Sequence, residues 1–94
     1  MSSYQGVNFS TTCDRLNKVF KENITTYALE SECDKVQVEY EFTFKNDHGQ
    51  MVEAYLYLWK EYSTIWEDCH YDFHIGADSV SESHDLYNYL ISKL

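Results

Sequence analysis

The chain of 94 residues lacks proline altogether and has only three glycines and three cysteines. Three scattered glycines cannot form the Gly-rich loop that binds phosphate groups. The cysteines, Cys13, Cys33 and Cys69, are odd in number and contain no CxxC pair, which favours free thiols over a disulfide framework. We therefore expect a protein of a reducing compartment, with the cytoplasm as the default location.

Long hydrophobic runs are also missing. The longest, residues 54–59, is far shorter than the ~20 residues that a membrane-spanning helix needs. Residues 1–6 have neither the basic region nor the apolar stretch of a signal peptide. These absences predict a protein that neither crosses a membrane nor is exported.

Basic residues are scarce, with seven Lys and Arg against sixteen Asp and Glu, for a net charge of −9. The imbalance is concentrated after residue 25: residues 26–94 carry four lysines and fourteen acids, a net of −10. A potential this one-sided repels nucleic acid and membranes and attracts basic proteins. The charge therefore predicts a basic protein partner, such as a nucleic-acid-binding enzyme or complex, and no direct binding of nucleic acid.

Hydrophobic residues, at 44%, are abundant enough for one core, so residues 1–94 are expected to form a single domain. Residues 1–9 show no clear periodicity and are predicted to form an irregular N-terminal arm. Apolar residues then recur at helical spacing after a run of N-capping Ser and Thr, which predicts a helix over about 11–22. Residues 25–30 fit a strand or the tail of that helix, and β-branched Thr25 and Thr26 favour the strand.

Three segments alternate between apolar and polar residues with the period of a strand: 36–44, 51–61 and 66–75. Asn46–Gly49 has the composition of a turn between the first two. A capping-box pattern at Ser79–Glu82 precedes an apolar stripe that predicts a C-terminal helix. The expected fold is α+β: two layers, with an antiparallel meander of three or four strands flanked by an N-terminal and a C-terminal helix on one face.

The other face of the expected sheet combines carboxylates with large aromatic side chains, which suits the docking of a basic protein partner. Its residues are Glu39, Glu41, Glu53, Tyr55, Tyr57, Trp59, Asp68 and Asp72. Two alternatives stay open: a plain solvated sheet face, and a homodimer or adaptor interface through the same aromatics.

Alternation also places His70 and His74 on that face beside Asp68 and Asp72. Imidazole and carboxylate groups can bind Zn²⁺, but structural zinc sites usually combine ligands from separate segments. We therefore favour surface histidines whose pKa the aspartates raise, with a metal- or ligand-binding protein as the alternative. Cys69 is expected to be a buried small hydrophobe, pointing away from His70. We expect no catalytic residues, no cofactor and no enzymatic activity.

In size, acidity and lack of motifs, the chain is similar to many small phage-encoded inhibitors of host defence, including anti-CRISPR proteins. The similarity is one of type, and it assigns no role to any residue. It implies an inhibitor or modulator that imitates the charge of a nucleic acid on the surface of its target.

Overall fold

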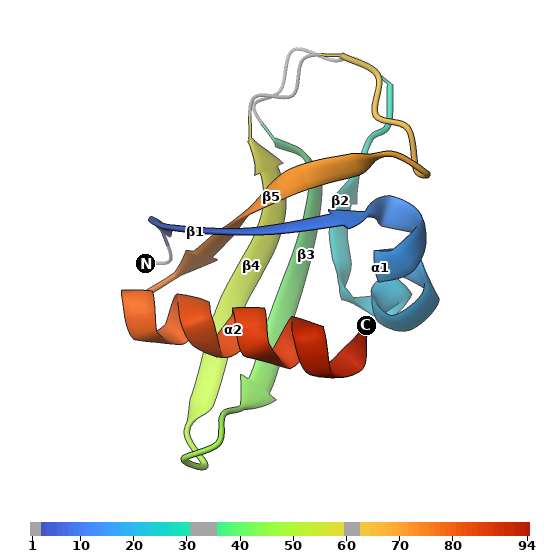
Figure 1. Ribbon diagram of the computed structural model, residues 1–94. Helices are drawn as coiled ribbons and strands as arrows, with labels where there is room; N and C mark the ends of the chain where they lie inside the picture. Colours follow the sequence, from blue (N-terminus) through green and yellow to red (C-terminus); the bar gives the residue numbers. More distant parts are fainter. Residues whose placement is uncertain (1–2, 31–35, 60–62) are drawn as a thin grey trace.

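The computed structural model describes residues 3–30, 36–59 and 63–94 (Figure 1). Within these residues the chain forms five strands and two α-helices, with one short 3₁₀ turn. In chain order they are β1 (Ser3–Thr12), α1 (Cys13–Phe20), η1 (Lys21–Asn23), β2 (Ile24–Tyr27), β3 (Val36–Lys45), β4 (Met51–Trp59), β5 (His70–Ala77) and α2 (Val80–Lys93).

The strands form one sheet in the order β1-β5-β4-β3-β2, with every neighbouring pair antiparallel. The α+β fold with an N-terminal and a C-terminal helix is thereby confirmed, and residues 24–27 are a strand rather than the end of a helix. The sheet has five strands instead of the expected three or four.

The irregular N-terminal arm was a wrong prediction, because residues 3–12 form β1 and pair with β5 along the sheet edge. Polar residues break its periodicity, and a register shift between Tyr4 and Asn8 interrupts the pairing. Gly6 lies in this interruption at φ 86°, a conformation that favours glycine. An edge strand with such an irregularity needs no clean alternation of apolar residues.

Both helices begin at the caps that the sequence offers. The Thr12 side chain accepts a hydrogen bond from the Arg15 amide at 3.1 Å, and Ser79 accepts one from the Glu82 amide at 3.2 Å. Because Thr11 and Thr12 belong to β1 and the chain tightens into η1 after Phe20, α1 is shorter than the predicted 11–22. In Figure 1, α2 crosses the sheet, packing on it through fully buried Leu86 and Leu90.

Strand β3 shows the predicted alternation, with Val38, Tyr40, Phe42 and Phe44 in the core. Its first residue is an exception. A register shift between Val36 and Glu39 puts one more residue on β3 than on β4, so Gln37 is buried and Val36 lies on the opposite face. The sequence pattern had placed Val36 on the core face, which is wrong.

The third predicted strand, 66–75, was misplaced, since β5 begins at His70 and continues to Ala77. A turn precedes it, closed by a hydrogen bond from the Cys69 amide to the Trp66 carbonyl at 3.1 Å. Cys69 is therefore exposed, not buried. Ile65 fills the core before this turn instead, and its amide donates to the Leu29 carbonyl at 2.7 Å.

Candidate functional site

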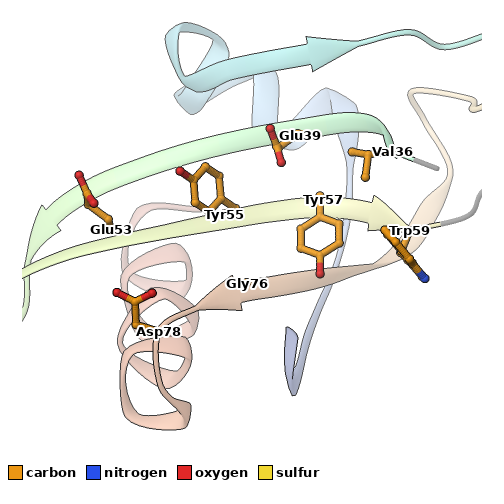
Figure 2. A pocket seen from close by; sticks show the side chains of 8 residues that line it. All are labelled: Val36, Glu39, Glu53, Tyr55, Tyr57, Trp59, Gly76 and Asp78. Carbon is orange, nitrogen blue, oxygen red and sulfur yellow. The ribbon is translucent and has the colours of Figure 1, made fainter. Parts of the chain in front are cut away.

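A groove lies on the sheet face opposite the core. Its volume is about 520 Å³, and its lining side chains come from β3, β4 and the end of β5 (Figure 2). The lining residues are Val36, Glu39, Glu53, Tyr55, Tyr57, Trp59, Gly76 and Asp78. Alternation along β4 explains the arrangement, because its even-numbered residues Val52 to Leu58 are buried in the core and its odd-numbered residues face the groove.

Gly76 creates the space at the groove floor. It is the cross-strand partner of Tyr55 in β4 and of Tyr4 in β1, so it leaves a gap in a row of large side chains. A Cβ atom at this position would lie 3.2 Å from Cε1 of Tyr57. The Tyr57 ring therefore leans over the glycine, as a ring can where the neighbouring strand has no side chain.

Tyr57 is held by other aromatic rings. Its ring meets His74 edge to face at 5.6 Å between centroids and Trp59 at 6.3 Å. Tyr4 stacks on the far side of His74 at 4.1 Å. Burial is the main cause that raises the pKa of Tyr57, and Tyr4 and Glu39 add to it. The four rings form a continuous row from β1 across β5 to the end of β4.

Carboxylates border the tyrosines. The register sets Glu39 opposite Tyr57 and Glu41 opposite Tyr55, at the short spacing of cross-strand pairs. The Glu39 carboxylate also accepts a hydrogen bond from Oγ1 of Thr25 in β2 at 2.7 Å, which fixes its position. The negative charge of Glu41 raises the pKa of Tyr55, as to a lesser extent do burial and the charges of Glu53 and Glu39. Of the residues that the structure describes, no lysine or arginine lines the groove.

The structure brings six of the eight residues predicted to bind a partner to this surface. Five line the groove, and Glu41 borders it beside Tyr55. Asp68 and Asp72 lie elsewhere. Asp68 is in the turn before β5, and exposed Asp72 pairs with Ser10 of β1, in a part of β5 that has no partner residue in β4.

Sequence reasoning missed four contributors: Val36, Gly76, Asp78 and the stacked Tyr4. Gly76 carried a usable signal, since a glycine inside a strand often marks a close approach of neighbouring groups. The sheet faces on which Tyr4 and Val36 lie could not be predicted. They depend on register shifts in β1 and β3, and the residue pattern does not indicate these shifts.

His70 and His74 differ in their surroundings. Exposed His70 starts β5, whereas His74 is packed between Tyr4 and Tyr57. Burial lowers the pKa of His74 and outweighs the opposing effect of Asp72, so the expectation that aspartates raise the pKa is wrong for this histidine. Over residues 3–30, 36–59 and 63–94, no group of three or more His, Cys, Asp and Glu side chains is placed to hold a metal ion.

A second polar cluster lies between α1, β2 and the loop before β5. The Tyr40 hydroxyl donates to Oδ1 of Asn17 at 2.5 Å, and Nδ2 of Asn17 donates to the Tyr27 hydroxyl at 2.8 Å. The Tyr27 hydroxyl in turn donates to the Glu67 carboxylate at 2.6 Å. Burial raises the pKa of the neighbouring Cys13 thiol to about 11, so it is a poor nucleophile near neutral pH. This chain of satisfied hydrogen bonds fits a structural role.

The chain matches no protein-family model, no curated protein and no solved structure. Among the described helices, none combines the length and apolarity needed to span a membrane. The geometry and charge of the groove are therefore the observations from which a function can be argued.

Proposed function

We propose that this is a non-enzymatic binding protein whose docking face binds a basic surface on a nucleic-acid-handling protein and blocks its substrate. The docking face comprises the groove and its border: Val36, Glu39, Glu41, Glu53, Tyr55, Tyr57, Trp59, Gly76 and Asp78. The observation that carries the proposal is a groove in which carboxylates and aromatic rings meet, with no lysine or arginine among its described lining residues.

Charge and aromatic area would serve different steps of binding. The net charge of −9 accelerates the encounter with a basic partner and makes association sensitive to salt. Burial of the aromatic rings slows dissociation and depends little on salt. A phage-encoded inhibitor of host defence, such as an anti-CRISPR-like protein, would combine both properties, acting in the host cytoplasm.

The same charge argues against the adaptor or homodimer alternative. A symmetric dimer through the docking face would bring the face against its own copy. Glu39, Glu41 and Glu53 would then approach like charges in a partly desolvated interface, which costs free energy. A basic partner removes that cost, so a heterologous complex is favoured.

The test begins with affinity capture from a lysate of the host cell at low salt, followed by elution at high salt and identification of the basic proteins released. Binding kinetics are then measured with the purified partner. The double variant Glu39→Lys/Glu41→Lys should slow association and flatten its salt dependence, because it reverses the charge beside the groove. Tyr57→Ala should mainly accelerate dissociation.

The matched control is Asp68→Lys/Asp72→Lys, which changes the net charge equally at exposed positions outside the docking face. It should slow association less than the Glu39/Glu41 variant does. If both double variants have the same effect and Tyr57→Ala, confirmed folded, dissociates like the parent, another surface binds the partner and the proposal is wrong.

A further inference from the structure

We infer that the groove is a receptor for an arginine side chain of the partner, with the guanidinium group lying on the Tyr55 and Tyr57 rings and hydrogen-bonded to the carboxylates around them. This inference rests on the proposed function and names the chemical group that the docking face recognises. It follows from three properties of the groove: its shape, its rigidity and its charge.

The shape suits one long side chain. A volume of about 520 Å³ lies within the range of small-ligand sites. Figure 2 shows Tyr55 and Tyr57 following one another along β4, with Glu53 and Asp78 near one end and Trp59 at the other. An arginine side chain laid along this row could therefore place its guanidinium group over the tyrosine rings, with carboxylates at the edge of the rings.

The rings are held in place before any partner arrives. Tyr57 rests against Gly76, and it is flanked by His74 and Trp59 at centroid distances of 5.6 and 6.3 Å. Its ring loses little conformational freedom on binding, and pre-organisation of this kind lowers the entropic cost of association. Trp59 is 44% exposed, so the groove is open to a partner at that end.

The charge favours a cation, and the aromatic rings favour guanidinium over ammonium. The negative field is strong enough at Tyr55 to raise the pKa of its hydroxyl, with Glu41 as the first cause. The planar, weakly hydrated guanidinium group can stack on a ring while its N–H groups reach carboxylates at the edge. A lysine ammonium is compact and strongly hydrated, so it gains the charge attraction but less from the rings.

Two pentapeptides of equal charge serve as probes. Both have glycine at the first, third and fifth positions; one has arginine and the other lysine at the second and fourth. Each is titrated into isotopically labelled protein and followed by NMR at low and at physiological salt. The arginine peptide should bind about threefold to tenfold more tightly than the lysine peptide. A difference of this size is expected from an exposed or partly desolvated cation–π contact. The largest shifts should fall on Tyr55, Tyr57 and Gly76.

Variants at Tyr57 test the role of the ring. Tyr57→Phe keeps the aromatic face and should keep the preference for arginine. Tyr57→Leu removes one of the two aromatic faces and should reduce the preference for arginine, since Tyr55 keeps its ring and the charge attraction is common to both peptides. Both variants should melt near the parent temperature; a poorly folded one is replaced by the corresponding change at Tyr55.

The outcomes separate this inference from the proposed function. Equal affinity of the parent for both peptides, or a preference that is undiminished in Tyr57→Leu, overturns the arginine receptor but leaves a charge-driven docking face. A preference lost in Tyr57→Phe also overturns it, because the hydroxyl rather than the ring would then select arginine. If neither peptide shifts resonances of the groove, the inference and the proposed docking face are both wrong.

Discussion

The two faces of the sheet follow the same alternation but are used in different ways. On the face covered by the helices, β3 and β4 contribute fully buried side chains such as Tyr40, Phe42 and Leu56. On the docking face, the same strands contribute half-exposed tyrosines between carboxylates. Packing of the core therefore explains the residues of the covered face. It does not explain why the docking face carries aromatic rings.

Polar groups also differ between the faces. On the covered side, the hydroxyls of Tyr40 and Tyr27 are joined in a chain of hydrogen bonds that ends at Glu67. On the docking face, the carboxylates of Glu39 and Glu53 line a groove that has no lysine or arginine among its described lining residues. The first arrangement joins its groups to one another, whereas the second gathers negative charge that a basic partner can neutralise.

The largest expected difference between the faces is in stability. Phe42→Ala should lower the free energy of unfolding by about 3–5 kcal/mol, because it leaves a cavity beside Phe20 and Tyr89. Glu41→Ala, the neighbouring residue on the other face, should change it by less than about 0.5 kcal/mol. Urea unfolding of both variants measures the contrast. A larger loss for Glu41→Ala would show that the register of β3 is shifted by one residue.

The second largest difference in stability between the two faces is expected when a single tyrosine hydroxyl is removed. Tyr40→Phe should cost about 1–2 kcal/mol, because Oδ1 of Asn17 loses its donor in a part-buried setting. Tyr55→Phe, with the same chemical change at a half-exposed site, should cost less than about 0.5 kcal/mol. Urea unfolding again measures both. Equal losses would contradict the view that the covered side depends more strongly on its side-chain hydrogen bonds than the docking face does.

The covered face was largely predictable from the sequence. Period-two alternation predicted strands over residues 36–44 and 51–61, and the caps at Thr12 and Ser79 predicted the starts of the helices. The structure confirms these local signals, apart from Val36 at the start of β3 and from residues 60–61, which lie outside the described residues. These signals suffice because a strand buried on one face repeats its pattern at every second residue, and a cap needs one side chain at a defined position.

The ends of the docking face were not predictable in the same way. The side on which Val36 lies depends on a bulge in β3, and β1 is a strand only because β5 pairs with it. Both are tertiary effects without a local pattern. Alternation also failed at Asp68, where a turn replaces the expected strand. The sequence could therefore predict Tyr55, Tyr57 and Glu39 together, but not Tyr4 or Asp78.

A pH titration should report the packing of His74 between Tyr4 and Tyr57, beside the docking face. Its folded-state pKa is below the ordinary 6.5, so the unfolded chain binds the proton first as the pH falls. Stability should therefore decrease as the pH falls from 6.5 towards the lower folded-state pKa, and this group contributes no pH dependence well above 6.5.

Tyr4→Ala removes the stacked ring and exposes His74, so the pKa measured by NMR should rise towards 6.5. Asp72→Asn serves as the control. It removes the charge that opposes burial and should lower the pKa further. A pKa that is unchanged in Tyr4→Ala would mean that β1 does not shield His74.

The smallest change in stability is expected at Gly76, where two opposing effects nearly cancel. Alanine would restrict the unfolded chain, which stabilises by about 0.4–1 kcal/mol at a position whose backbone accepts it. Its Cβ would lie 3.2 Å from Cε1 of Tyr57, so the ring has to move by a few tenths of an ångström. Because that ring faces an open groove, it can yield, and Gly76→Ala should change the free energy of unfolding by less than about 0.5 kcal/mol. The ring should nevertheless move relative to His74, which NMR detects as changed ring-current shifts at the histidine. A loss above about 2 kcal/mol would show instead that the Tyr57 ring cannot shift by even this small distance.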